Sequence, residues 1–316
     1  MMGQIAQKLT MLKRWAKIAT GKTAVAVDQG IGQAYEVGRL AGYYNDLTGK
    51  VADSTLLDGG GVPLSVIAGG ERVHFPIAVF QYGLGCYDLT ILKPNEAERH
   101  LASLKACADW AIEVQREDGS WDAFGPIGSA RYTVSSMGQG EGCSMLLRAH
   151  VAFEDERYRM AALKAADFLL LDMNKGGVAA YDGDELFLEE YPQRPRRSVM
   201  NGWIFSLFGL YDAALVDERF EEPFRRSAET LAKHLDDYDA GYWTYYDLEH
   251  RIASPAYHKL HIAQLLVLGE LTGDSRFADK AASYEKYQTS RVNLARAILR
   301  KVGQKLTERS DAVISQ

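Results

Sequence analysis

From Pro76 onward, apolar residues recur at intervals of three and four positions, which is the spacing of an amphipathic helix. Each segment with this pattern is as long as an ordinary globular helix. Short stretches rich in glycine, aspartate and aromatic residues separate the segments. The pattern predicts a mainly α-helical body, with helices at residues 76–89, 95–116, 135–153, 155–173, 199–215, 218–237, 257–272 and 274–289.

Two features of this region recur about every sixty residues. An aspartate opens a helix at Asp155, Asp217 and Asp274, where its side chain can accept hydrogen bonds from the first free amides. A glycine-containing loop follows a helix, and we expect it to turn into a short β-element at 118–121, 176–178 and 241–243. Because one two-helix unit cannot bury its own apolar faces, successive units must stack. We expect an α/α toroid, or incomplete α/α barrel, with its long loops gathered around a cleft at one end.

The pattern changes on both sides of this body. Residues 1–22 contain five basic residues and no acid, which predicts a basic amphipathic helix. Peripheral contact with an anionic membrane and packing on the body or on a partner are both open for it. Residues 23–75 are broken by glycines and predict an extended or β-hairpin arm. We therefore expect a catalytic toroid at 76–290 and a basic C-terminal helix and tail at 291–316, which could pack on the body or form a homodimer contact.

Composition narrows the function. The chain has 316 residues, 47% of them hydrophobic, and a net charge of −6, which disfavours a general nucleic-acid binder because phosphate binding needs a basic face. Its three cysteines are odd in number and have no CxxC spacing, so we expect buried, reduced thiols. We see no signal-peptide pattern and no apolar run of about 18 residues. The expectation is a soluble, cytoplasmic protein without metal or cofactor.

Candidate chemistry gathers in the loops before the predicted helices. Glu190 and Tyr191 precede a proline, and Tyr246 and Tyr257 lie at the same predicted end. A phenol with a pKa of about 10 is a weak acid, and arginine can stabilise its anion and make it a strong base. Such a pair of groups suits removal of a proton from carbon.

Other polar residues could hold a ligand near these groups. His258 and His261 are three positions apart, but no third ligand accompanies them. We therefore expect histidines whose hydrogen bonds are satisfied within the protein, or hydrogen bonding to a sugar, rather than metal binding. Arg148, Arg197 and His258 are candidates to neutralise a carboxylate that gains charge when the proton next to it is removed. Gln139 and Asn201 open helices in which small residues allow a close approach.

A set of short motifs resembles the D-glucuronyl C5-epimerases of heparan sulfate and heparosan biosynthesis. Each motif is weak alone, and their order along the chain makes the resemblance specific. The motifs are Gly61-Val62-Pro63-Leu64-Ser65, Gln81-Tyr82-Gly83-Leu84, Met137-Gly138-Gln139-Gly140, Leu147-Arg148-Ala149, Glu190-Tyr191-Pro192, Asn201-Gly202, Ser206-Leu207, Gly209-Leu210-Tyr211-Asp212, Tyr246-Asp247-Leu248, Tyr257-His258, His261-Ile262 and Gln264-Leu265.

The resemblance implies a helical toroid that inverts C5 of glucuronate to give iduronate within a polysaccharide. It implies catalytic roles for Glu190, Tyr191, Tyr246 and Tyr257, and it places Tyr82 at the substrate cleft. The expected partner is an anionic, glucuronate-containing polysaccharide such as heparosan.

Two departures from the animal enzymes stand out. Their β-barrel domain is missing here, and their Tyr-Asp-Leu-Arg-His motif reads Tyr246-Asp247-Leu248-Glu249-His250. The second change concerns the cation that would hold the substrate carboxylate. Three alternatives stay open at this point. They are a polysaccharide lyase, a glycoside hydrolase using Glu190 and Asp247 as opposed carboxylates, and a glycan-binding scaffold without catalysis.

Overall fold

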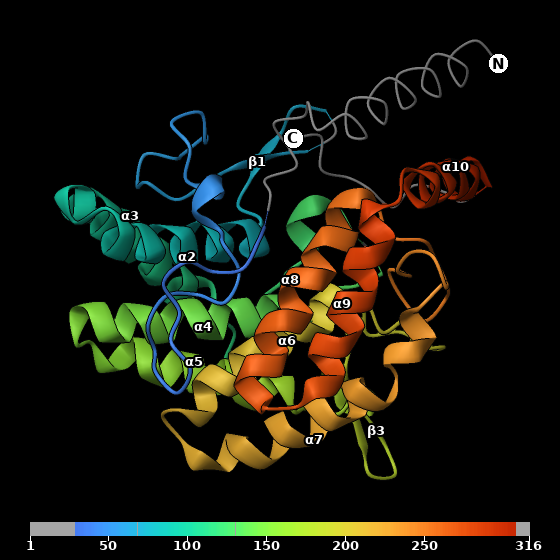
Figure 1. Ribbon diagram of the computed structural model, residues 1–316. Coiled ribbons are helices and arrows are strands. Elements are labelled where there is room, and N and C mark those ends of the chain that lie inside the picture. Colours follow the sequence, from blue (N-terminus) through green and yellow to red (C-terminus); the bar gives the residue numbers. More distant parts are fainter. Residues whose placement is uncertain (1–28, 68, 130, 308–316) are drawn as a thin grey trace.

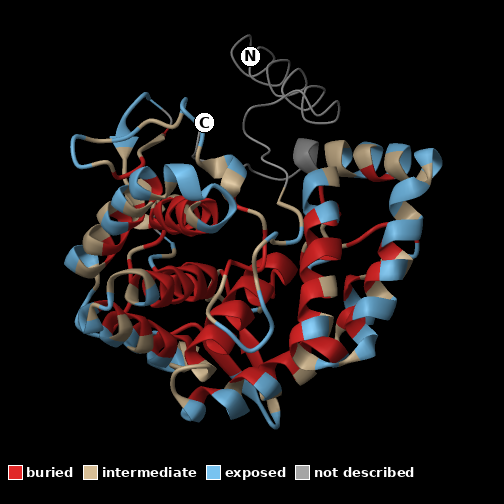
Figure 2. Cartoon of the chain, turned by 60° about the vertical axis from the view of Figure 1, so that its left-hand side comes forward, coloured by how far each residue is buried: buried red, intermediate tan, exposed pale blue. Residues whose placement is uncertain are grey.

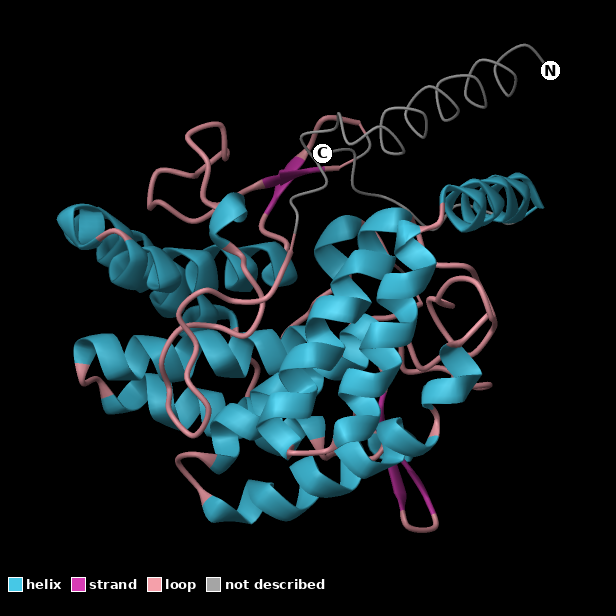
Figure 3. Ribbon diagram, viewed as in Figure 1, coloured by secondary structure: helices cyan, strands magenta, loops and turns pink. Residues whose placement is uncertain are grey.

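The computed structural model describes residues 29–67, 69–129 and 131–307 (Figure 1). The predicted N-terminal basic helix at 1–22 lies outside the described residues, as do the first residues of the predicted arm. Within the described part, helices make up most of the fold (Figure 3). They are α2 (Pro76–Leu92), α3 (Ala97–Val114), α4 (Ser136–Phe153), α5 (Glu156–Leu169), α6 (Met200–Ala214), α7 (Glu221–Lys233), α8 (Pro255–Thr272), α9 (Ser275–Thr289) and α10 (Arg291–Thr307).

Each of the eight predicted helices of the body falls on an observed one, which confirms the mainly α prediction. The largest difference is at predicted residues 218–237, where short 3-10 helices at Glu218–Phe220 and Leu235–Tyr238 flank α7. The repeated aspartates are N-caps as expected. The carboxylates of Asp155, Asp217 and Asp274 accept hydrogen bonds from the amides of Arg157, Arg219 and Arg276.

The helices form four hairpins in succession, α2 with α3, α4 with α5, α6 with α7, and α8 with α9. The first helix of each hairpin also contacts the first helix of the next, so that α2, α4, α6 and α8 form a continuous inner row (Figure 1). The second helices cover this row from outside. This arrangement is the incomplete α/α toroid that the sixty-residue repeat predicted.

The inner and outer helices differ in burial for a reason visible in their sequences. α4 is buried from Ser136 to Ala149 and α6 from Met200 to Ala213, because neighbours surround an inner helix on nearly every side. α7, an outer helix, buries only Phe224 and a few other residues along one face, and its charged residues face solvent. Figure 2 shows this contrast as a buried interior inside a partly exposed outer layer.

Strands are short. β1 (Ser65–Val66) pairs antiparallel with β2 (Arg72–Val73), and β3 (Ala179–Asp182) pairs antiparallel with β4 (Glu185–Leu188). The loop at 176–178 leads into β3 as predicted. The loop at 118–121 does not open a strand, so the prediction of a β-element was wrong there, whereas the loop at 241–243 leads into β-bridges at Thr244 and Tyr245 rather than into a named strand. Isolated bridges from Asp239 to Thr244 and from Tyr245 to Ile252 give the second of these loops its shape.

The described part of the arm, residues 29–75, is largely irregular and is fastened to the inner helices. The Tyr44 hydroxyl donates to Asp212 of α6 at 2.6 Å, and the Tyr43 amide donates to Asp88 of α2 at 2.7 Å. Both tyrosines are fully buried. The three cysteines are free and buried, as the sequence predicted, in Cys86, Cys107 and Cys143.

Candidate active site

The connections that lead from outer to inner helices meet at one end of the inner row. The Ser136 amide at the start of α4 donates to the Glu189 carbonyl before α6, at 3.2 Å. The Met200 amide at the start of α6 donates in turn to the Tyr246 carbonyl before α8, at 3.1 Å. These backbone bonds place the two segments that carry Glu190 and Tyr246 beside each other, although 56 positions separate those residues in the sequence.

Glu190 follows β4 and lies against the first turn of α6. Its side chain is 5% exposed, and a Cβ on Gly202 would stand 2.4 Å from its Oε2 atom, so only glycine fits at that position. Burial raises the pKa of Glu190 to about 7, although a hydrogen bond with the Tyr191 phenol and the charge of Arg197 oppose the rise. Glu190 is therefore a carboxyl group that can both release and accept a proton near neutral pH.

The two remaining tyrosines form a pair next to this carboxyl group. The rings of Tyr246 and Tyr257 lie 4.9 Å apart at an interplanar angle of 61°, and a hydrogen bond joins the two phenols. Desolvation and the Glu190 carboxyl raise the pKa of Tyr257 to about 12, against the effect of that hydrogen bond. Tyr257 is 40% exposed, so part of its side chain is accessible from solvent. The structure thus brings Glu190, Tyr191, Tyr246 and Tyr257 together.

The expected arginine-stabilised phenolate is not what the structure shows. The Arg197 guanidinium lies 5.1 Å from the centroid of the Tyr191 ring, and its charge lowers the pKa of that phenol. Burial and the Glu190 carboxyl raise the same pKa by more, so the pKa of Tyr191 is well above its ordinary value. Burial also holds the pKa of Tyr246 well above its ordinary value. All three phenols are therefore protonated at neutral pH, and Glu190 is the group among the four whose pKa lies near neutrality.

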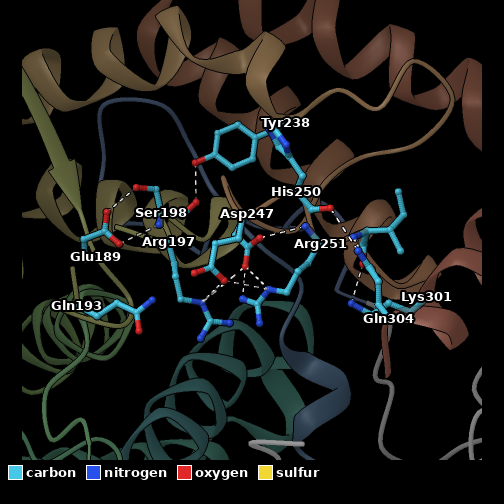
Figure 4. Close-up of polar contacts among 12 residues, drawn as sticks. Glu189, Gln193, Arg197, Ser198, Tyr238, Asp247, His250, Arg251, Lys301 and Gln304 are labelled. Carbon is cyan, nitrogen blue, oxygen red and sulfur yellow. Dashed lines mark hydrogen bonds and ion pairs between the residues drawn. The ribbon is translucent and has the colours of Figure 1, made fainter. Parts of the chain in front are cut away.

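A network of charges holds the segment that carries Tyr246 (Figure 4). Asp247 is fully buried, and its Oδ2 atom accepts a hydrogen bond from Arg251 Nε at 2.6 Å. Arg197 Nε lies 3.8 Å from the same oxygen. Arg197 is also 3.6 Å from Glu249, which stands where the related motif has arginine. Both contacts of Arg197 are longer than hydrogen bonds, and its Nε has no hydrogen-bond partner among the described residues. Arg197 is thus a cation with hydrogen-bond donors that no described residue uses.

The segment that carries Glu190 is anchored in the same way (Figure 4). The buried Glu189 carboxylate accepts hydrogen bonds from the amide and the hydroxyl of Ser198. The Tyr238 hydroxyl donates to the Ser198 carbonyl at 2.6 Å. Ser198 has a positive φ of 42°, which a non-glycine residue adopts only when its surroundings hold it there. These contacts fix the turn between Glu190 and α6.

His258 and His261 are buried and neutral. Desolvation lowers the pKa of His258 to about 4 and that of His261 to about 3, so neither neutralises a carboxylate as expected for His258. His258 stacks on Trp243 at 3.7 Å, and because its Nε2 faces the Tyr284 carbonyl it must donate there. Its Nδ1 then accepts from the Thr244 hydroxyl, whose oxygen accepts from His261 Nδ1. His261 Nε2 remains an acceptor without a partner among the described residues.

Two amide side chains near His261 also have an unpartnered buried oxygen. Asn201 Oδ1 and Gln264 Oε1 have no hydrogen-bond partner in the described part of the chain, and Gln264 Nε2 donates to the Asn201 carbonyl at 3.3 Å. A buried acceptor without a donor costs stability, so these atoms are suited to receive a hydroxyl group from a ligand. The geometry is consistent with ligand contacts for Asn201 and His261, and it adds Gln264. Its motif with Leu265 was the only signal for it in the sequence.

Glu141 is a second residue that the sequence analysis missed. It is fully buried on α4, where Gln81 donates to Oε1 at 2.9 Å and Oε2 has no partner among the described residues. Burial raises its pKa to about 8, against the effects of the Gln81 hydrogen bond and of Lys50. A lone glutamate among the small residues of 138–144 was the available signal.

The structure does not bring three of the predicted ligand-binding residues to the group formed by Glu190 and the three tyrosines. Gln139 uses both ends of its amide on the loop before α4, since Oε1 accepts from the Trp121 amide at 3.1 Å and Nε2 donates to the Gly119 carbonyl at 3.0 Å. Tyr82 is buried on α2, with its phenol hydrogen-bonded to Ser103 of α3 and to Cys86. Both side chains therefore have structural roles, on faces directed toward the protein.

Arg148 is the third of these residues. It is completely buried on α4 and ion-paired to Asp212 of α6 at 2.6 Å. Its other donors go to the carbonyls of Ala41, Gly42 and Ser144 at 3.0–3.1 Å. A guanidinium with all its donors engaged cannot also hold a substrate carboxylate, so Arg148 fastens the arm to the inner helices instead.

Replacing Arg148 with methionine should lower the free energy of unfolding by about 3–5 kcal/mol, because it leaves the buried Asp212 charge unpaired. Urea denaturation at neutral pH measures this. As a control, Arg157→Met removes an exposed pair with Asp155 and should leave stability nearly unchanged. If the Arg148 variant were as stable as the wild type but no longer bound ligand, the predicted substrate-binding role of Arg148 would be correct.

Among the described residues, no group of three or more His, Cys, Asp and Glu side chains could hold a metal ion. The helices of the described ranges include none that is both long enough and apolar enough to cross a lipid bilayer.

Comparison with known proteins covers most of this site. Residues 114–286 match a family model described as the D-glucuronyl C5-epimerase C-terminus. This range includes Glu190, Tyr191, Tyr246 and Tyr257. It runs from the end of α3 to α9 and so takes in three of the four hairpins.

Individual proteins are also similar to the chain, and one of them carries the name of this family. A D-glucuronyl C5-epimerase of Caenorhabditis elegans is 31% identical over 218 residues, which cover 59% of this chain and 35% of that protein. The chain thus matches about a third of the length of this relative. An uncharacterized protein of Methanocaldococcus jannaschii is 30% identical over 141 residues, covering 42% of this chain and 46% of that protein. Among solved structures, an unsaturated glucuronyl hydrolase from Bacillus sp. GL1 aligns at 19% identity with a TM-score of 0.45, covering 67% of this chain and 60% of that one.

Proposed function

Because the chain belongs to the D-glucuronyl C5-epimerase family, we propose that it inverts C5 of D-glucuronate residues within an anionic polysaccharide and produces L-iduronate. The reaction removes the proton on C5 from one face of the ring and returns a proton to the other face. The observation that carries the proposal is the meeting of Glu190, a carboxyl group with a pKa of about 7, with the protonated Tyr246–Tyr257 pair.

In the forward direction, the ionised Glu190 accepts the C5 proton and becomes neutral. The electron pair moves into the adjacent carboxylate, and Tyr257 then donates its phenolic proton to C5 from the opposite face. The Tyr257 phenolate that results is stabilised by the hydrogen bond with Tyr246, which lowers the pKa of Tyr257. Exchange with solvent restores the proton on Tyr257 and removes the one on Glu190.

The difficult part of this chemistry is electrostatic, since a second negative charge develops on the substrate carboxylate. Arg197 is the cation best placed to stabilise it, because its guanidinium lies beside Tyr191 and its contacts with Asp247 and Glu249 leave hydrogen-bond capacity. This role would replace that of the arginine found in the related motif at the position of Glu249. We assign the buried acceptors of Asn201, His261 and Gln264 to hydroxyl groups of the sugar.

A hydrolase is disfavoured by the state of its second carboxylate. Asp247 is fully buried and bound by Arg251, so it is not free to activate water opposite Glu190. A lyase would share the abstraction at C5 and then expel the sugar linked at C4. The products therefore separate the lyase from the epimerase.

Incubation of the protein with heparosan in D₂O should place deuterium at C5 of the glucuronate residues and form iduronate without shortening the polymer. NMR measures the exchange and the new stereocentre, and size-exclusion chromatography measures chain length. Unsaturated, shortened fragments would identify a lyase. Tight binding with neither exchange nor cleavage would contradict the epimerase proposal and indicate a glycan-binding scaffold without catalysis.

A further inference from the structure

Helix α10 is a concentration of positive charge on an acidic protein. The chain carries a net charge of −6, yet α10 has no acidic residue. Its basic residues are Arg291, Arg296, Arg300, Lys301 and Lys305. In Figure 1, α10 leaves the end of α9 and crosses beside the loop that leads to α8.

Direct contacts fasten α10 to the segment that carries Tyr246. The Lys301 ammonium donates to the Ile252 carbonyl at 2.6 Å, and Gln304 Oε1 accepts from the Ile252 amide at 3.0 Å (Figure 4). Ile252 is bridged to Tyr245, and the Lys301 ammonium lies 5.8 Å from the centroid of the Tyr246 ring. The basic side chains of α10 therefore lie beside one edge of the candidate active site.

Two arginines of α10 are held in place by aromatic rings. The Arg296 guanidinium lies 3.8 Å from the centroid of the Tyr242 ring, and that of Arg300 lies 5.2 Å from the Tyr245 ring. Arg300 also donates to the Tyr245 hydroxyl at 3.5 Å. Stacking on a ring orients a guanidinium and leaves its edge free for a planar anion.

These arginines also differ from several arginines on the outer helices. Arg296 and Arg300 are exposed and make no ion pair with a carboxylate of the described residues. The arginines Arg157, Arg159, Arg219 and Arg276 on the outside of the toroid all pair with carboxylates. The charges of Arg296 and Arg300 are thus available to an external anion.

We propose that α10 is an exosite for the polysaccharide, in which Arg296 and Arg300 bind acidic groups of sugar residues that flank the one held at Glu190 and Tyr257. The identity of the polymer rests on the proposed function. The binding surface itself rests on the exposed, ring-supported arginines and on their continuity with the Tyr246 segment. It would increase affinity for long chains without taking part in proton transfer.

The test compares the double variant Arg296→Gln, Arg300→Gln with the control Lys164→Gln, Lys286→Gln, which removes the same charge from exposed positions on α5 and α9. Each exposed ion pair is worth up to about fivefold in binding, so the double variant should bind heparosan roughly 5- to 25-fold more weakly. The control should bind as wild type does. Calorimetry at low salt measures affinity, and the difference should shrink at high salt because screening weakens exposed pairs.

Chain length and conservative variants sharpen the result. In the C5-exchange assay, the KM ratio between variant and wild type should grow with oligosaccharide length, whereas kcat stays unchanged. Arg296→Lys, Arg300→Lys keeps the charge and should recover part of the affinity, which a loss caused by misfolding would not do. Circular dichroism verifies the fold of each variant.

Three results would overturn the exosite. These are unchanged heparosan affinity in the glutamine variant, an equal loss in the control, and binding of the wild type to anionic lipid vesicles that is stronger than its binding to heparosan and is lost in the glutamine variant, which would make α10 a membrane-docking helix. A different result would contradict the proposed epimerase function. Without C5 exchange in the wild type, an α10-dependent affinity for heparosan would still support the exosite.

Discussion

Replacing Tyr257 with phenylalanine should lower the rate of C5 deuterium exchange by roughly 10²–10⁴-fold, the usual contribution of a positioned acid or base. The variant loses the proton donor but keeps the ring that lies 4.9 Å from Tyr246. Its KM should change little, since the hydroxyl acts mainly in the proton-transfer step. The measurement is the initial rate of deuterium incorporation into heparosan, followed by NMR under saturating substrate.

Tyr181→Phe is a matched control for this variant. Tyr181 is 42% exposed, against 40% for Tyr257, and its hydroxyl donates to the Leu170 carbonyl away from the site. Exchange should be unaffected there. Tyr246→Phe should have a smaller effect than Tyr257→Phe, because Tyr246 acts by stabilising the Tyr257 phenolate. If Tyr257→Phe exchanged label at the wild-type rate, Tyr257 would not be the acid.

Glu190→Gln should reduce exchange by a similar factor, roughly 10²–10⁴-fold, because an amide cannot accept the C5 proton. The side chain keeps nearly the same shape, so it still fits against Gly202. The same NMR assay measures the rate, with Glu185→Gln on β4 as a control for the loss of one negative charge outside the site. An unchanged rate would show that a different group is the base.

The pH profile gives an independent check on Glu190. Since its pKa is raised to about 7, the ionised base is scarce at low pH, and kcat should rise about tenfold per pH unit until it levels off above about 7. Residual activity of Glu190→Gln should lack this limb. A flat wild-type profile between pH 5 and about 8 would contradict the assignment.

The contribution of Glu190 to the free energy of unfolding should fall as the pH rises, whereas kcat should increase. A carboxyl group with a raised pKa in the folded protein holds its proton more tightly there than in the unfolded chain. Its contribution to stability is therefore complete below its ordinary pKa of 4.5 and is lost as the pH rises through about 7. Glu190→Gln removes a buried charge, so above this range the variant should be at least as stable as the wild type while being inactive.

The helices of this protein were predictable because the signals that define them are local. The caps at Asp155, Asp217 and Asp274 bind amides two positions away, and the apolar spacing of each helix reflects its own buried face. The recurrence of these signals also predicted the hairpins and their stacking. The β-element expected at 118–121 does not form, and the one expected at 241–243 is limited to isolated bridges, since pairing depends on a partner strand that a turn alone does not provide.

The four central candidate residues, which the structure brings together, were predicted from the sequence through ordered motifs that resemble a family. What these motifs could not provide was the state of each group. A phenol stabilised by arginine was expected to act as a base, and the pKa of Tyr191 beside Arg197 is instead raised by burial and by Glu190. His258 was expected to carry positive charge, and its contacts with Trp243 and Tyr284 keep it neutral.

The sequence by itself therefore determined the helices, their order, the repeated hairpin and the motif residues, since these depend on neighbours within a few positions. Tertiary structure alone decided which cations are available. Arg148 reaches Asp212 and the carbonyls of Ala41 and Gly42, so its charge is used inside the fold, whereas Arg197 keeps donors free beside Tyr191. Both are arginines next to recognisable motifs. Protonation and availability arise from burial and from contacts between distant segments, and no local pattern in the chain carries that information.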